Sequence, residues 1–229
     1  MINSLFPPVV LPVNPVNFDF HCHSTVSDGL LPPAAVAARA AANGVDCWAL
    51  TDHDALGGLP EAEATATELG MRFVNGVEIS IEWRGTPIHI VGLAFDRTAP
   101  GLVAGLDALR QGRIERARRM GDALAAIGIP GVYDGALAYA TNADLISRAH
   151  FARYLVSIGI AKDVGSVFQY YLTPGKPGYV EHQCATLADA LGWISDAGGV
   201  AVVAHPGRYK LSGGDMRKFL DEFKALGGQ

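Results

Sequence analysis

Histidines and carboxylates gather in a few short motifs along this chain. The first motif is His21-Cys22-His23. On a β-strand, residues i and i+2 lie on the same face, so both imidazoles can point at one metal ion while Cys22 points away. A single histidine is more often structural than functional, but later motifs supply more candidate ligands: Asp28, His53, Glu78, His89, His150 and His205.

These residue types favour a particular metal chemistry. Neutral imidazole and carboxylate ligands are typical of Zn, Mn or Fe sites, and the cysteines are not clustered as a closed structural zinc site requires. A carboxylate such as Glu78 can bridge two cations through its two oxygens. Two cations about 3.5–4 Å apart activate water and stabilise the attacking and leaving oxygens of phosphoryl transfer. The pattern therefore predicts metal-assisted hydrolysis, not electron transfer.

Alternating strands and helices must position these residues. We expect strands over residues 17–22, 45–50, 73–79 and 88–95, and helices over residues 32–42 and 60–69. Strands and helices that alternate at this spacing predict a parallel α/β architecture. Nearly all the candidate ligands lie at or just beyond the C-terminal end of a predicted strand. In parallel α/β folds, active sites are built at that edge.

The pattern divides the chain into four segments. We expect a flexible proline-rich arm over residues 1–16, an α/β part over 17–100, a helical insertion that caps the substrate over 101–178, and a second α/β part over 179–229. Residues 101–172 are predicted to be almost entirely helical. The α/β pattern then resumes with a helix near 186–197, a strand over 200–204 and a helix near 215–226.

Composition excludes several classes of partner. The 229 residues carry a net charge of -5, which argues against a broad basic face for duplex DNA. The sequence has no run of about 18 apolar residues, so we expect no membrane-spanning helix. Three widely spaced cysteines (Cys22, Cys47 and Cys184) and the lack of a signal peptide favour a reducing cytoplasm. No pattern predicts the oligomeric state.

Taken together, the motifs resemble those of a known family. HCHS…SDG, TDHD, GVEIS, His89, His150 and AHPGR are similar to the successive motifs of the PHP (polymerase and histidinol phosphatase) family, from about residue 17 to the end. The segments NGVEIS, SRAHFAR and LTPGKPGY are similar to one branch. That branch hydrolyses the 3′-phosphate of 3′,5′-bisphosphonucleosides, and related members of the RNase AM type trim short RNA from the 5′ end. The resemblance implies a distorted seven-stranded β/α barrel of the TIM-like kind, interrupted by the insertion.

The resemblance also implies three metal sites. The first would be held by His21, His23 and Glu78, and the second by Glu78, His89 and His150. The third would be held by Asp28, His53 and His205. The implied cofactor is two or three divalent cations, with Mn²⁺ expected and Fe²⁺ or Zn²⁺ as alternatives. The implied catalytic residues are His53, His205 and Asp54, with one of the two histidines assisting proton transfer to the leaving oxygen.

One family motif is missing from this sequence. The family closes with a late Asp-x-His motif on its last strand, whereas this chain ends at Gln229 without it. Either the sequence is a fragment that lacks the last strands, or the protein has lost part of its site. Because every earlier ligand is present, we expect a fragment.

Basic residues near the insertion predict the substrate pocket. Arg113 and Arg116 lie on the same side of a helix, and Arg148 is close to His150. Guanidinium groups bind phosphate oxygens in a bidentate manner. The resemblance places these arginines, together with Asp54, around the non-reacting parts of a small nucleotide with two phosphates. Lys176 is a weaker candidate, and a solvated helix face is the alternative for the arginine run.

Three other functions stay open. A histidinol-phosphate-type phosphatase would share the metal ligands but needs no second phosphate site. An amidohydrolase-type C–N hydrolase also uses an HxH motif, but such sites often use a lysine on a barrel strand. The lysines here fall in predicted loops or helices. A metal-stabilised protein without activity is the third alternative.

Overall fold

A mixed α/β fold is seen in the computed structural model, which describes residues 16–140, 142–181 and 184–229. The predicted arm therefore lies almost wholly outside the described residues. Within them, one curled sheet has five strands in the order β1-β2-β3-β4-β5. The strands are β1 (Phe18–Asp19), β2 (Cys47–Leu50), β3 (Arg72–Trp83), β4 (Thr86–Leu93) and β5 (Val200–Val203). The seven strands implied by the family resemblance are not all present in this part of the chain.

The predicted parallel arrangement holds for only part of the sheet. β1, β2 and β3 are parallel, but β4 is antiparallel to both β3 and β5. The cause is the two-residue turn Arg84-Gly85, in which both residues have positive φ angles of 50° and 76°. Such a turn forms a hairpin, because a parallel connection needs a long crossover.

The first strand is shorter than predicted. β1 ends at Asp19, so His21, Cys22 and His23 lie beyond it and do not form the strand face that the HxH spacing suggested. The chain stays beside β2 because Thr51 pairs with Cys22. The Cys22 amide donates to Thr51 Oγ1 at 3.1 Å, and the Thr51 amide donates to the Cys22 carbonyl at 3.0 Å.

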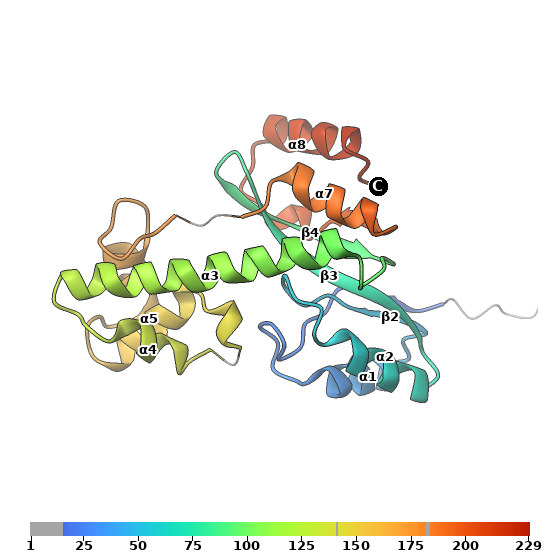
Figure 1. The fold of residues 1–229 in the computed structure, drawn as a ribbon, viewed down its shortest axis with the longest axis horizontal. Coiled ribbons are helices and arrows are strands. Elements are labelled where there is room, and N and C mark those ends of the chain that lie inside the picture. The colour runs from blue at the N-terminus through green and yellow to red at the C-terminus, as the bar shows by residue number, and fades with distance from the viewer. Residues whose placement is uncertain (1–15, 141, 182–183) are drawn as a thin grey trace, which may run out of the picture.

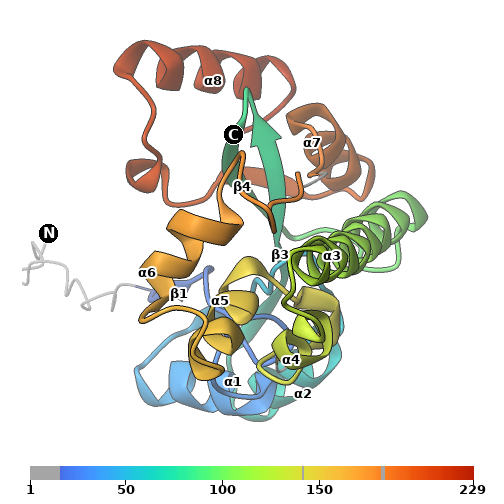
Figure 2. The same cartoon turned by 90° about the vertical axis from the view of Figure 1, so that its left-hand side faces the viewer.

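Helices cover the sheet on both sides. The helices α1 (Pro33–Ala42) and α2 (Leu59–Glu68) lie on one side, and α7 (Leu187–Asp196) and α8 (Gly213–Ala225) lie on the other (Figure 1). Figure 2 shows the same separation from a second direction. These helices match the predicted ones within a few residues. The larger of two hydrophobic cores, the first core, lies between these layers. Its fully buried side chains include Trp48, Ile79, Ile90 and Phe219.

The predicted helical insertion is confirmed as helical. It contains α3 (Pro100–Ala126), α4 (Val132–Leu137), η1 (Ala143–Leu145), α5 (Arg148–Ser157), α6 (Val164–Val167) and the π-helical turn η2 (Phe168–Leu172). A second core lies inside it, around Met120, Phe151 and Leu155. α3 joins the two cores, because Leu102 and Leu106 near its start are buried in the first. In Figure 1, α3 runs from the sheet to the insertion. No helix of the described residues is long and apolar enough to cross a membrane.

Candidate metal centre

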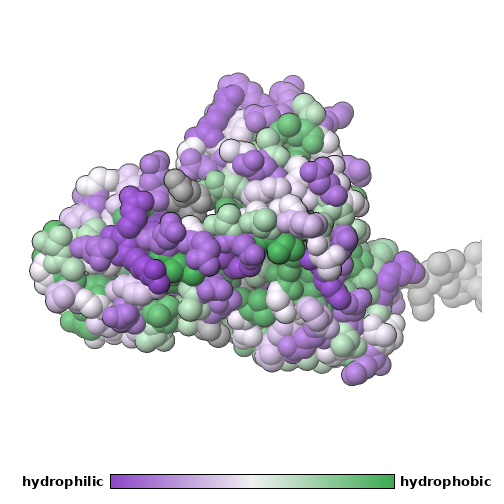
Figure 3. All heavy atoms as spheres, viewed as in Figure 1, coloured by the Kyte–Doolittle hydropathy of each residue, from purple (hydrophilic) through white to green (hydrophobic). Residues whose placement is uncertain are grey.

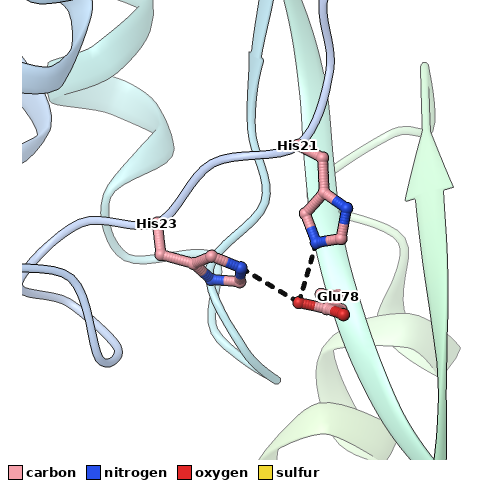
Figure 4. A group of neighbouring side chains, drawn as sticks. All are labelled: His21, His23 and Glu78. Carbon is pink, nitrogen blue, oxygen red and sulfur yellow. Dashed lines mark ion pairs between the residues drawn. The ribbon is translucent and has the colours of Figure 1, made fainter. Parts of the chain in front are cut away.

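Glu78 lies at the centre of a ring of histidines. Its side chain is 1% exposed, in the middle of β3 and not at the strand end expected from sequence. Four histidine nitrogens lie 3.0 Å from its carboxylate oxygens, and a fifth lies 3.5 Å away: His21 Nε2, His23 Nε2, His89 Nδ1 and His205 Nε2, then His53 Nδ1. His21 and His23 approach Glu78 from the segment after β1 (Figure 4).

Sheet direction explains why these residues meet. His21, His53 and His205 follow the C-terminal ends of β1, β2 and β5, which point the same way. β4 runs in the opposite direction, so His89 near its N-terminal end lies at the same edge, opposite Ser80 of β3. The predicted ligands do meet where β1, β2 and β5 end, but Glu78 and His89 lie within β3 and β4 and not at strand ends.

His205 has a backbone that non-glycine residues rarely adopt. Its φ is 31° and its ψ is 56°, and Pro206 follows in the short 3-10 helix η3 (Pro206–Arg208). Tyr209 closes this turn: its hydroxyl donates to the Ala204 carbonyl and accepts from the His89 amide, both at 2.9 Å. Strained backbone of this kind persists where surrounding contacts enforce it, often at functional sites. Tyr209 was not predicted, because nothing in the sequence marks a tyrosine that joins two strands.

The residues present fit divalent cations. The described residues contain three groups in which the ligand atoms all lie within 4.8 Å of one another. The groups are His21, His23 and Glu78; His23, Asp28 and His53; and His53, Glu78 and His89. The Nδ1 atoms of His53 and His205 are buried and make no hydrogen bond within the described part of the chain, although His53 Nδ1 lies 3.5 Å from Glu78. Buried polar atoms are normally paired, and a bound cation is one partner that imidazole takes. The donor set of imidazole and carboxylate suits Zn, Mn or Fe.

Charge at the centre is concentrated on Glu78. Burial raises the pKa of this carboxyl, but hydrogen bonds from His21, His23 and His89 outweigh burial and hold the pKa far below its usual value. Burial lowers the pKa of His53, against the attraction of Glu78. The centre thus combines an ionised carboxylate with a histidine that favours its neutral, ligand-competent form.

Two predicted ligands lie farther out. The Asp28 side chain is 69% exposed, with oxygens 3.7 Å from His23 Nδ1 and 3.9 Å from His53 Nε2. His150 lies in the first turn of α5, where its Nδ1 accepts from the Ser147 amide at 3.0 Å. It belongs to none of the three ligand groups among the described residues, and its role as a ligand stays a prediction.

A cavity of about 670 Å³ opens over the centre. His53, His89 and Asp28 line it together with residues of α3 and α5. The lining includes four arginines: Arg113, Arg116, Arg148 and Arg153. The structure therefore brings the predicted arginines to the same space as the metal centre. Arg153 was missed, although its position one helical turn after His150 is a signal that the sequence contains.

Asp54 lies behind the cavity wall. It is fully buried, with a φ of 48°, and its oxygens accept from the Ser80 amide at 2.7 Å and pair with Arg113 Nη2. Arg113 also donates to Ser80 Oγ at 2.8 Å. Asp54 is not among the lining residues, because these partners occupy its carboxylate. In this arrangement it orients Arg113, whereas direct contact of Asp54 with the substrate stays a prediction.

The other basic residues differ in position. Arg116 donates through Nε to the Val180 carbonyl at 2.8 Å, and burial, with nearby Arg148, lowers its pKa to about 10. It is therefore still charged at neutral pH. Lys176 is exposed in its loop and does not line the cavity. Backbone hydrogen bonds within residues 171–179 close this loop as a turn, so its predicted contact with substrate gains no support.

The outer face of α3 is solvated. Figure 3 shows a hydrophilic band along this helix. Arg118 and Arg119 are exposed and do not line the cavity. For these two residues the alternative of a solvated helix face therefore describes the structure.

Comparison with known proteins identifies the family. The chain is 54% identical to the 3′,5′-nucleoside bisphosphate phosphatase of Chromobacterium violaceum over 93% of its length and 75% of the relative. It is 47% identical to a 5′-3′ exoribonuclease of Haemophilus influenzae, over 92% of this chain and 76% of that one. A solved structure described as an amidohydrolase of Chromobacterium violaceum, with bound sulfate and no metal, matches with a TM-score of 0.81 at 53% identity, over 93% of this chain and 75% of that one. A structure described as a metal-dependent phosphoesterase of Bifidobacterium adolescentis matches with a TM-score of 0.76 at 26% identity, over 94% and 76%. Residues 19–223 match the PHP domain model, and the chain belongs to the PHP domain family.

Proposed function

We propose that this chain is a metal-dependent phosphoesterase that removes the 3′-phosphate of 3′,5′-bisphosphonucleosides. The observation that carries this proposal is the shared cavity, which is lined both by candidate metal ligands (His53, His89 and Asp28) and by four arginines. A nucleotide with two phosphates fits this combination. One phosphate reaches the metal centre, while the other binds guanidinium groups.

The chain's own residues divide the work. Arg116, Arg148 and Arg153 bind the non-reacting phosphate, and Arg113 is held in place by buried Asp54. His53 and His205 both lie beside Glu78, with ring nitrogens 3.5 and 3.0 Å from its carboxylate. One of them holds the proton that the leaving oxygen receives, as a general acid does.

The centre takes divalent cations, held by the histidines around Glu78 together with Asp28. Bound cations would supply Lewis-acid stabilisation of the phosphoryl oxygens and a nucleophilic water at neutral pH. We propose two or three cations, with Mn²⁺ as the physiological ion, and we include His150 as a ligand.

Trimming of short RNA from its 5′ end is a second proposed activity of the same site. The relative from Haemophilus influenzae is a 5′-3′ exoribonuclease, and the cavity has room for a terminal nucleotide. The 5′-terminal phosphate of the RNA would occupy the place of the non-reacting phosphate, near Arg153, and the first phosphodiester, on the 3′ side of the terminal nucleotide, would take the place of the reacting phosphate.

The alternatives make different demands on the cavity. A histidinol-phosphate phosphatase needs one phosphate site, whereas four arginines line this cavity. An amidohydrolase often uses a lysine near the metals, and no lysine lines the cavity among the described residues. Both observations favour the nucleotide phosphatase.

The test is phosphate release from 3′,5′-bisphosphoadenosine by Mn²⁺-loaded protein, with the product identified by chromatography. The expected product is the 5′-monophosphate. His53→Ala is expected to slow release by about 10²–10⁴-fold, the usual contribution of a positioned acid–base group. Glu68→Gln, an exposed change at the end of α2, is the control and leaves the rate unchanged. Absence of release from folded, metal-loaded protein, together with cleavage of a C–N substrate, would replace this proposal with the amidohydrolase.

A further inference from the structure

The loop that carries Asp28 is built around a buried carboxylate that the mechanism does not use. Asp52 is 1% exposed and lies next to His53. Its Oδ1 accepts from the Ser24 amide at 2.7 Å and from the Ser27 hydroxyl at 2.5 Å, and its Oδ2 accepts from the Ser24 hydroxyl at 2.6 Å. These three hydrogen bonds compensate for burial of the charge. They also tie residues 24–27 to the segment after β2.

The rest of the loop leaves little room for another path. The amides of Ser27 and Gly29 both donate to the Ser24 carbonyl, at 3.0 and 2.9 Å. A Cβ atom on Gly29 would lie 2.3 Å from the His23 carbonyl oxygen, so only glycine fits there. The path from His23 to Asp28 is therefore determined by Ser24, which Asp52 holds.

Ser27 connects Asp52 to His23. The Ser27 hydroxyl has one proton, and an ionised carboxylate only accepts, so this proton points to Asp52. Ser27 Oγ lies 3.5 Å from His23 Nδ1 and can only accept a hydrogen bond from it. His23 Nδ1 then keeps its proton. Nε2, which hydrogen-bonds to Glu78 at 3.0 Å, is then the nitrogen at which a cation would replace the proton.

We infer that Asp52 is a positioning residue of the metal centre. It acts through Ser27 on the tautomer of His23 and through Ser24 on the place of Asp28. This inference rests on the proposed metal centre. Partners that orient metal-binding histidines in this manner typically contribute 10–100-fold to metal affinity.

The test is a calorimetric titration of chelator-treated protein with Mn²⁺. Asp52→Ala and Ser27→Ala are expected to weaken Mn²⁺ binding by about 10–100-fold. Asp52→Asn is expected to stay close to the unmodified protein, because its amide oxygen, in place of Oδ1, still accepts from the Ser24 amide and the Ser27 hydroxyl. Its NH2 group, in place of Oδ2, can donate to Ser24 Oγ, which reverses the direction of that one bond. Ser157→Ala removes a hydroxyl at the end of α5, far from this loop, and is the matched control.

Each outcome decides the inference. Unchanged Mn²⁺ affinity in Ser27→Ala would overturn the connection to His23, even if Asp52→Ala does not fold. An Asn variant as weak as the Ala variant would overturn positioning, because charge alone would then be responsible. If the unmodified protein binds no Mn²⁺, the proposed metal centre fails and this inference fails with it, whereas Mn²⁺ binding that the variants leave unchanged overturns this inference alone. Circular dichroism of each variant separates weaker binding from lost structure.

Discussion

At the scale of single residues, one carboxylate organises the site. The side chain of Glu78 is 1% exposed, and five histidine nitrogens lie within 3.5 Å of its carboxylate oxygens. Five imidazoles around one buried carboxylate are costly to assemble unless they serve a common ligand. Four arginines line the same cavity, and their proposed role is to bind the non-reacting phosphate of the substrate.

The proposed role of Arg116 in phosphate binding can be tested against a second arginine of α3. Arg116 lines the cavity, and Arg118, two residues later, is exposed outside it. Arg116→Ala is expected to lower kcat/KM for 3′,5′-bisphosphoadenosine by about 10–100-fold, the equivalent of one charged hydrogen bond. The loss for 3′-AMP, which lacks the second phosphate, is expected to be smaller. Steady-state kinetics with both substrates measure this ratio.

Arg118→Ala is the control for this prediction and leaves both substrates unaffected. An equal loss for both substrates in Arg116→Ala would mean that its bond to the Val180 carbonyl, and not phosphate binding, is what matters. Lys176→Ala is expected to have no effect, because its side chain lies in an exposed turn.

At the scale of elements, α3 connects the barrel-like part to the insertion. Gly105 of α3 lies against Trp193 of α7, and a Cβ atom there would be 2.4 Å from the indole ring. Gly105→Ala is expected to destabilise the protein by about 1–3 kcal/mol through overpacking. For a chain of this size that lowers Tm by about 2–4 °C per kcal/mol, which scanning calorimetry detects.

Gly101 in the same helix has no atom within 4 Å of its would-be Cβ. Gly101→Ala is therefore the matched control and is expected to leave Tm unchanged or raise it slightly, because alanine favours a helix. Equal Tm values for the two variants would show that α3 and α7 do not pack closely.

At the scale of the whole molecule, the metal centre joins distant parts of the chain. Its histidines follow or lie within four different strands, from His21 to His205. Cations that bind only the folded chain stabilise it by mass action. Mn²⁺ at 100 times its Kd is expected to add about 2.7 kcal/mol and to raise Tm by about 5–10 °C.

Thermal unfolding with and without a chelator measures this stabilisation. Glu78→Gln is the matched variant, because it keeps the volume of the side chain but removes the shared charge. We expect Mn²⁺ to leave the Tm of this variant almost unchanged. The same Mn²⁺-dependent shift in both proteins would show that the cations bind elsewhere.

The chemistry of this protein was readable from its sequence. Imidazole and carboxylate groups are recognised by residue type, and their place after predicted strands follows from local periodicity. The helices of the insertion and the later α/β pattern were predicted for the same reason, since each depends on neighbouring residues. Glu78 could be named as a candidate bridging ligand because a carboxylate has two oxygens and because the surrounding motif resembles one of the PHP family, although its place in the middle of β3 was not predicted.

Tertiary structure alone decided which groups face one another. β4 runs antiparallel, with His89 within it and not at its end, and Asp54 is buried behind Arg113 and does not line the cavity. Asp52 holds the loop of Asp28 through serines that are 25 and 28 residues away. Residue types determine what a site can bind, but contacts between distant segments determine the direction in which each side chain points. That direction depends on packing and sheet order, which local sequence patterns do not contain.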